Sequence, residues 1–125
     1  MAANEPIPRD VTDFLLRTIA SIAELEALLL MRRETASWSA DALAQRLYVS
    51  SMEAEHVLRT LMSLGFLNKD AEGYSYHCSS SELDAIVAKT AEVHARQLIP
   101  VTKLIHEHGR KIRRFADAFR FRRDP

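Results

Sequence analysis

Two places in this sequence hold side chains that can do chemistry. His77 and Cys78 are adjacent, and an imidazole beside a thiol is the pair that cysteine nucleophiles use. His106 and His108 flank Glu107, and imidazole and carboxylate groups are ordinary zinc ligands. The spacing within each set decides whether its members can act together.

Neither spacing suits the chemistry. His106 and His108 lie in a stretch of helical period, and helical residues two apart point about 200° apart, so they cannot share an ion. His77 and Cys78 follow an alternating stretch, and adjacent strand residues face opposite sides of a sheet. No acidic partner or glycine-rich oxyanion loop accompanies them, and nothing nearby lowers the pKa of the thiol, which favours a packed thiol over a nucleophile or a redox sensor. We therefore expect no metal, no cofactor and no catalytic residue, and the protein is predicted not to be an enzyme.

The net charge of zero hides an uneven distribution of charge. Residues 110–125 hold seven Lys or Arg against two Asp, whereas the rest of the 125-residue chain holds 10 basic and 15 acidic residues. A basic end on an acidic body suggests a polyanion or an acidic protein as partner, and a solvated tail is the alternative. The count does not decide between them.

The sequence predicts a cytoplasmic protein without a membrane segment. No basic region followed by an apolar run opens the chain, and the longest apolar stretch, LEALLLM, is far shorter than the roughly 20 residues that span a bilayer. The phenylalanines of the basic end (Phe115, Phe119 and Phe121) are too sparse for membrane anchoring. Cys78 is the only cysteine, which excludes an intrachain disulfide and fits a reducing compartment.

The elements that position these residues can be predicted from apolar spacing and caps. Residues 11–29 have helical period, with a break or bend favoured near Ser21, where a capping-box pattern begins. Residues 35–38 form a short extended segment with Trp38 buried, and Ser39 caps a helix over 40–47.

A second capping box, Ser50 to Glu53, begins another helix. Its apolar stripe runs through Ala54, Val57, Leu58, Leu61 and Leu64, and Gly65 follows in the position of a left-handed C-terminal cap. The period then changes, and two short β-runs around the turn at 68–73 predict a hairpin.

The order of these elements resembles the winged helix-turn-helix domain of bacterial transcription regulators. The likeness is carried by Ser39–Leu47, Ser50–Glu53, Val57, Leu58, Leu61, Leu64–Leu67 and Gly73–Tyr76. It implies a supporting helix at 39–47, a recognition helix at 51–64 and a wing tip at 70–73. A long helix after the wing is similar to regulators of the PadR-like and MarR-like groups, which implies dimers. The ending RRFADAFRFRRDP resembles that of small proteobacterial proteins, which implies no mechanism.

We therefore predict a mainly α fold with a small β-hairpin wing, a winged helix-turn-helix plus a long C-terminal helix. The predicted divisions are an N-terminal leader and helix (1–21), the winged helix-turn-helix domain (22–78), a long dimerisation helix (79–109) and a basic C-terminal segment (110–125).

The predicted function is a DNA-binding transcriptional regulator with its recognition helix in the major groove of double-stranded DNA. The alternative is an adaptor that binds another protein without DNA, because Glu53 and Glu55 lie on the exposed face and anions repel phosphate. Glu53 has a capping role, whereas Glu55 has no local role that the sequence shows. Arg32, Arg33 and Arg46 supply further positive charge. The predicted DNA contacts are Ser51, His56, Arg59, Thr60 and Lys69, with Arg113 and Arg114 as auxiliary phosphate contacts.

The apolar stripe over 83–108 is broad for the core of one small domain, which predicts a homodimer. We expect one helix of about seven turns, kinked at Pro100 and ended by Gly109. His94 and Gln97 on this stripe either set the register of the dimer or mark its border with solvent. The predicted dimer contacts are Leu83, Ile86, Val87, Leu98, Val101, Leu104 and Ile105.

Overall fold

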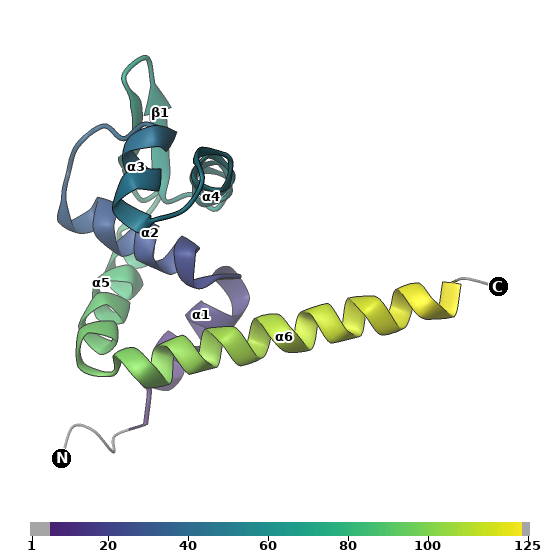
Figure 1. Ribbon diagram of the computed structural model, residues 1–125. Coiled ribbons are helices and arrows are strands. Elements are labelled where there is room, and N and C mark those ends of the chain that lie inside the picture. Colours follow the sequence, from purple (N-terminus) through teal and green to yellow (C-terminus); the bar gives the residue numbers. More distant parts are fainter. Residues whose placement is uncertain (1–5, 124–125) are drawn as a thin grey trace.

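The computed structural model describes residues 6–123, and their side chains as far as residue 111. Helices dominate this part of the chain, and one antiparallel hairpin projects from it (Figure 1). The helices are α1 (Arg9–Thr18), α2 (Ile22–Arg33), α3 (Ala40–Leu47), α4 (Ser51–Ser63), α5 (Ser81–Arg96) and α6 (Leu98–Arg123), with strands β1 (Leu67–Asp70) and β2 (Gly73–Tyr76) between α4 and α5.

Serine caps set where four of these helices begin. The hydroxyl oxygens of Ser21, Ser39, Ser50 and Ser80 accept hydrogen bonds from backbone N–H groups three residues on, at 3.1–3.2 Å. Each bond satisfies a donor that has no partner inside its helix. The break predicted near Ser21 is thereby confirmed.

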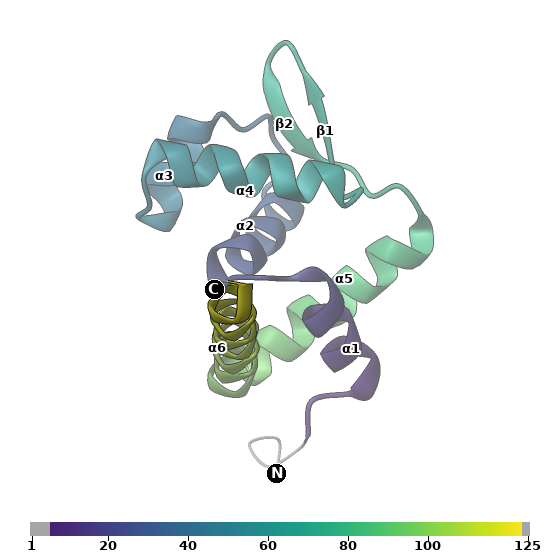
Figure 2. The same cartoon turned by 90° about the vertical axis from the view of Figure 1, so that its right-hand side faces the viewer.

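The helix-turn-helix consists of α3 and α4, which pack against each other above α2 (Figure 2). The turn between them contains Tyr48, the only described non-glycine residue with positive φ, at 58°. On α4, the side chains of Ala54, Val57, Leu58 and Leu61 are buried as predicted. Leu64 was expected to continue this stripe, but its side chain is 39% exposed, because the helix already ends at Ser63.

Gly65 and Gly73 have positive φ, at the exit from α4 and at the start of β2. Gly65 has φ +91°, so the predicted left-handed exit from α4 is confirmed. The two strands pair from Leu67 opposite Tyr76 to Asp70 opposite Gly73, which makes the predicted hairpin longer and its turn tighter than 68–73. The extended segment predicted at 35–38 shortens to one bridge, from Trp38 to Tyr74.

The prediction of a single kinked helix after the wing is wrong. The chain leaves helical geometry at Gln97, where φ is −131° and ψ is 53°, and α6 starts at the next residue. Pro100 therefore falls in the first turn of α6, where its missing N–H leaves no bond unmade. Gly109 does not end a helix, because α6 continues through it to Arg123 and projects away from the body (Figure 1).

One core joins the winged helix-turn-helix to the helices beneath it. The rings of Phe14 in α1 and Phe66 before the wing meet edge to face, with centroids 6.0 Å apart. Val87 of α5 and Val101 of α6 are fully buried in the same core. The predicted fold class is therefore confirmed: a mainly α winged helix-turn-helix with a small hairpin wing and a long C-terminal helix.

Candidate nucleic-acid interface

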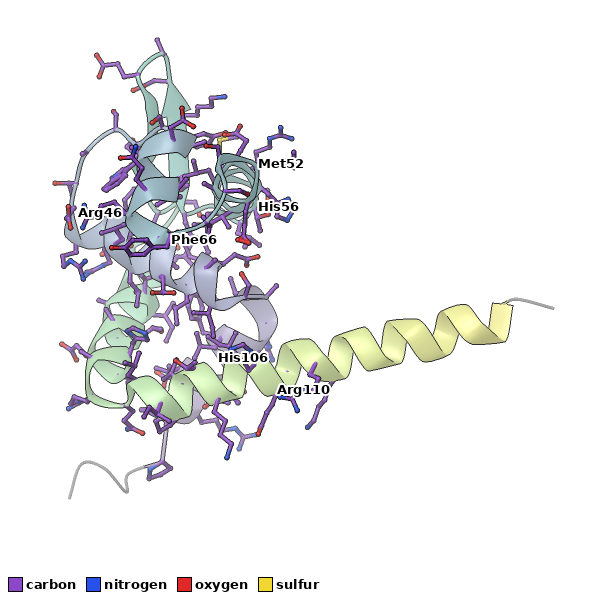
Figure 3. All side chains as sticks on the ribbon, in the orientation of Figure 1. Arg46, Met52, His56, Phe66, His106 and Arg110 are labelled. Carbon is purple, nitrogen blue, oxygen red and sulfur yellow. The ribbon has the colours of Figure 1, made fainter. Side chains whose placement is uncertain are left out.

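The exposed face of α4 carries most of the predicted contact residues. Ser51, His56 and Arg59 are exposed, and Thr60 is partly buried. Figure 3 shows His56 and Met52 together on the side of α4 that faces away from α3. The predicted orientation of this helix is therefore confirmed, although its contact with DNA is a separate question.

Ser51 already has a partner within the chain. Its hydroxyl donates to the Asp41 carboxylate of α3 at 2.6 Å. The bond joins the first turns of the two helices and places a carboxylate beside the start of α4. A base or phosphate contact by Ser51 would have to compete with this bond.

Glu55 has a role that the sequence did not reveal. Its Oε1 accepts a hydrogen bond from the Tyr74 hydroxyl of the wing at 3.3 Å, and the Arg59 guanidinium lies 3.5 Å from the same oxygen. The carboxylate therefore connects α4 to β2 and is offset by a cation one turn along the helix. The interpretation that Glu55 has no local role is wrong, because Arg59 pairs with it one helical turn along. Its second partner, Tyr74, lies 19 residues away in the chain, where no local pattern could indicate it.

Lys69 extends this connection onto the wing. Its ammonium group lies 5.1 Å from the centre of the Tyr74 ring, within cation–π range. Lys69, Tyr74, Glu55 and Arg59 thus form a contiguous set across the wing and α4, here called the wing–helix set. The two cations of this set, Lys69 and Arg59, are exposed. Tyr74 and Glu55 lie between them at one edge of the candidate interface, Tyr74 against Lys69 and Glu55 against Arg59.

The arginines of α2 and α3 form ion pairs with carboxylates of the same chain. Arg46 forms two hydrogen bonds to the carboxylate of Glu34, at 2.9 and 2.6 Å, and this guanidinium lowers the pKa of the Glu34 carboxyl. Its guanidinium also stacks 5.6 Å from the centre of the Trp38 ring. Arg33 lies 3.7 Å from the same carboxylate, and Arg32 lies 3.3 Å from Asp84. These residues add less positive charge to the surface than the sequence suggested.

Arg113 and Arg114 fall on α6, and their side chains lie outside the described residues. Their predicted role as auxiliary phosphate contacts therefore stays a prediction.

The Cys78 thiol belongs to a hydrogen-bonded cluster at the base of the wing. Its Sγ donates to the Tyr76 hydroxyl at 3.0 Å, and that hydroxyl donates to Asp84 of α5 at 2.5 Å. Burial raises the pKa of the Cys78 thiol, and the hydrogen bonds from Tyr76 and Arg32 lower that of the Asp84 carboxyl. The thiol is therefore a partly buried, hydrogen-bonded group whose pKa is shifted away from the lowered values typical of reactive cysteines.

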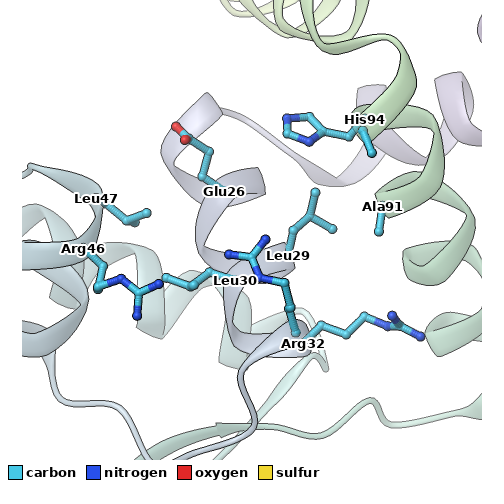
Figure 4. Close-up of a pocket in the computed structure, with 10 residues that line it drawn as sticks. Glu26, Leu29, Leu30, Arg32, Arg46, Leu47, Ala91 and His94 are labelled. Atoms are coloured by element: carbon cyan, nitrogen blue, oxygen red, sulfur yellow. The ribbon is translucent and has the colours of Figure 1, made fainter.

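A cavity that sequence reasoning missed lies between α2, α3 and α5 (Figure 4). It has a volume of about 500 Å³. His94 faces it from α5, and burial lowers the pKa of this imidazole against the opposing effect of Glu26. No run of residues in the sequence signals this cavity, because its lining comes from three separate helices. The lining residues are Glu26, Leu29, Leu30, Arg32, Arg33, Arg46, Leu47, Ala91, His94 and Ala95.

The predicted dimer residues divide into buried and accessible groups. Val87, Val101 and Ile105 are buried within the single chain. Burial in the core of one subunit already explains why these residues are apolar, so they give no evidence for a dimer. Leu98 is 54% exposed, and Leu83, Ile86 and Leu104 are partly buried. Ile99, which was not predicted, is 77% exposed beside Leu98.

The described residues offer neither a metal-binding cluster nor a membrane-spanning helix. Within that part of the chain, no three His, Cys, Asp or Glu side chains lie close enough together to hold a metal ion. Nor does any helix there combine the length and apolar character needed to cross a membrane.

Comparisons with known proteins give one distant likeness. No protein-family model matches the sequence, and no curated protein matches it. A solved structure that it resembles is that of a MarR family protein from Mycobacterium tuberculosis, with 19% identity, a TM-score of 0.48, and coverage of 88% of this chain and 82% of that one. A likeness this distant says nothing of function, which has to come from the chain's own side chains.

Proposed function

We propose that this protein is a dimeric, cytoplasmic DNA-binding transcriptional regulator that places α4 in the major groove of double-stranded DNA. The observation that carries the proposal is the wing–helix set. It holds one cation on α4 and one on the wing, with Tyr74 and Glu55 fixed between them. A winged helix uses the same two elements, with the helix against base edges and the wing against the adjacent backbone.

Within this proposal Arg59 contacts a base and Lys69 contacts a phosphate. Arg59 can exchange its ion pair with Glu55 for a contact with DNA, because its side chain is 72% exposed and the Glu55 carboxylate is partly exposed. Helix ion pairs of this spacing stabilise by only about 0.3–0.5 kcal/mol, whereas a bidentate contact with guanine contributes about 1–3 kcal/mol. The guanidinium therefore gains by leaving Glu55 for a guanine. His56 and Thr60 face the same groove, and Arg113 and Arg114 are proposed to add phosphate contacts.

The dimer is proposed to form through α5 and α6. The supporting observations are the projection of α6 from the body and the exposed pair Leu98 and Ile99 at its start (Figure 1). Two such subunits would present two copies of α4 to successive major grooves. Light scattering at micromolar concentration tests this, and a strict monomer would refute it.

A salt titration tests the proposal for DNA. The full chain is titrated onto labelled mixed-sequence duplex at 50 mM and 200 mM salt, and then onto a duplex selected by the protein. We expect a steep loss of affinity with salt, because each neutralised phosphate contributes a slope of about −0.9. Arg59→Ala should weaken binding to the selected duplex by about 1–3 kcal/mol. Arg17→Ala, which removes the same charge from an exposed position of α1, is the matched control and should change affinity little.

The pairing of Arg32, Arg33 and Arg46 with carboxylates favours a second candidate. An adaptor that binds another protein needs no surplus of cations, and the basic end would suit an acidic partner. Absence of binding to any duplex at 50 mM salt would favour the adaptor.

A further inference from the structure

Two large apolar side chains at the start of α4 are almost fully exposed, Tyr48 in the turn before the helix and Met52 in its first turn. The side chain of Tyr48 is 94% exposed and that of Met52 is 84% exposed, the highest values among the large hydrophobic residues described. Neither residue was predicted as a contact. Two such side chains close together in the sequence, at the start of the proposed recognition helix, point to a partner outside the chain.

The position of Met52 limits what that partner can be. It is the second residue of α4, and the N-terminal residues of a recognition helix are those that reach base edges. A thioether side chain has no strong donor or acceptor, so it cannot select a base through hydrogen bonds. The one apolar group that bases present in the major groove is the 5-methyl group of thymine.

The exposed neighbours of Met52 in the first turn of α4 offer polar groups that cannot recognise a methyl group. The Ser51 hydroxyl is engaged by Asp41 at 2.6 Å. Glu53 is exposed and can only accept, which suits the amino group of cytosine and opposes the acceptor edge of guanine. The first turn of α4 is therefore matched to pyrimidines, thymine through Met52 and cytosine through Glu53.

The size of the patch favours DNA over a protein partner. A tyrosine buries about 150–250 Å² and a methionine no more, so the two side chains together offer at most about 400–500 Å². A stable protein interface needs about 800 Å² on each side. Contact with a methyl group needs only one flexible side chain, and methionine adapts its shape readily.

We propose that Met52 is a specificity-determining residue that packs on the 5-methyl group of a thymine in the major groove. The inference rests on the proposed function and deepens it, because it names a base class that the site selects. It concerns Met52 alone, and Tyr48 is not needed for it.

The test replaces thymine by deoxyuridine, which lacks only the 5-methyl group. Each thymine of a duplex selected by the protein is replaced in turn, and the Kd is measured for wild type, Met52→Ala and Met62→Ala. Met62 is also on α4 and 40% exposed, but it lies near the far end, which makes it the matched control.

At one thymine in each half-site, deoxyuridine should weaken wild-type binding about threefold to fivefold, as expected for one buried methyl group. Met52→Ala should bind the two duplexes equally, and Met62→Ala should keep the wild-type difference. If duplexes bind but wild type is indifferent to deoxyuridine at every position, the inference falls and the proposed function stands. A difference that persists in Met52→Ala also overturns it. If no duplex binds, both fall together.

Discussion

Replacing each of the three glycines with alanine should give three different results, because each glycine meets a different environment. A Cβ at Gly73 would lie 2.6 Å from the backbone oxygen of Trp38, at φ +135°. A Cβ at Gly65 would lie 2.8 Å from the Ser79 hydroxyl oxygen, at φ +91°. Among the side chains and backbone that the structure describes, a Cβ at Gly109, inside α6, would meet only the Ala20 carbonyl oxygen, at 3.7 Å. The series therefore tests the wing, the exit from α4 and the corrected course of α6 together.

The expected magnitudes follow from these contacts. Backbone strain at a positive φ costs an alanine about 1–2 kcal/mol at Gly65 and Gly73. At Gly65 the serine side chain can rotate away, so Gly65→Ala should cost about that amount. At Gly73 the obstacle is backbone held by the bridge between Trp38 and Tyr74, which adds about 1–3 kcal/mol of overpacking. Gly109→Ala should instead stabilise by about 0.5–1 kcal/mol, because alanine is the better helix former.

The assay is unfolding in urea, followed by far-UV circular dichroism and by fluorescence of Trp38, the only tryptophan. All variants are compared at one protein concentration, because association would make stability depend on it. We expect stability in the order Gly109→Ala, wild type, Gly65→Ala and Gly73→Ala. A Gly73→Ala variant within 0.5 kcal/mol of wild type would refute the wing geometry, and a destabilised Gly109→Ala would refute the continuous α6.

Three further predictions concern single side chains. Ser50→Ala should lower the free energy of unfolding by about 1 kcal/mol, because it removes the cap of α4, and an unchanged urea midpoint would contradict this. Because the pKa of His94 is lowered on folding, the unfolded chain binds more protons as the pH falls through about 6.5, so stability should decrease there. In urea titrations from pH 8 to 5.5, His94→Gln should lose the part of the decrease that His94 causes, whereas a variant at exposed His77, His77→Gln, should retain it. Identical pH profiles for wild type and His94→Gln would count against the partly buried imidazole. Glu55→Gln keeps an acceptor for Tyr74 and removes a negative charge beside the DNA, so duplex affinity at low salt should rise by roughly threefold, and a loss of affinity would show that Arg59 depends on the carboxylate.

The features predicted correctly from the sequence are those that depend on neighbouring residues. Ser39 and Ser50 accept hydrogen bonds from N–H groups three residues away. Gly65 adopts a positive φ because glycine has no Cβ that would clash there. Such signals are contained in a few consecutive residues, which is why the order of helices and the hairpin could be predicted. The outward face of α4 followed from the same local period.

The errors arose where distant residues decide the outcome. The helical period continues across Gln97 without interruption, and Pro100, the one local signal of the break between α5 and α6, was interpreted as a kink and not as the first turn of a new helix. Glu55 has its role from Tyr74, and Arg32 pairs with Asp84 from 52 residues away. These pairings determine how much charge the candidate interface offers. They depend on the tertiary fold and leave no pattern in the sequence.

The most direct test of the central claim places a DNA-cleaving iron chelate on α4. In a Cys78→Ser background, His56→Cys supplies one thiol for the chelate, and Arg17→Cys, at an exposed position of α1, supplies the comparison. On a selected duplex, the chelate at position 56 should cut bases lining one major groove in each half-site, and the chelate at position 17 should cut nothing. Cleavage from position 17 alone, or no duplex bound at 50 mM salt, would contradict the claim that α4 enters DNA.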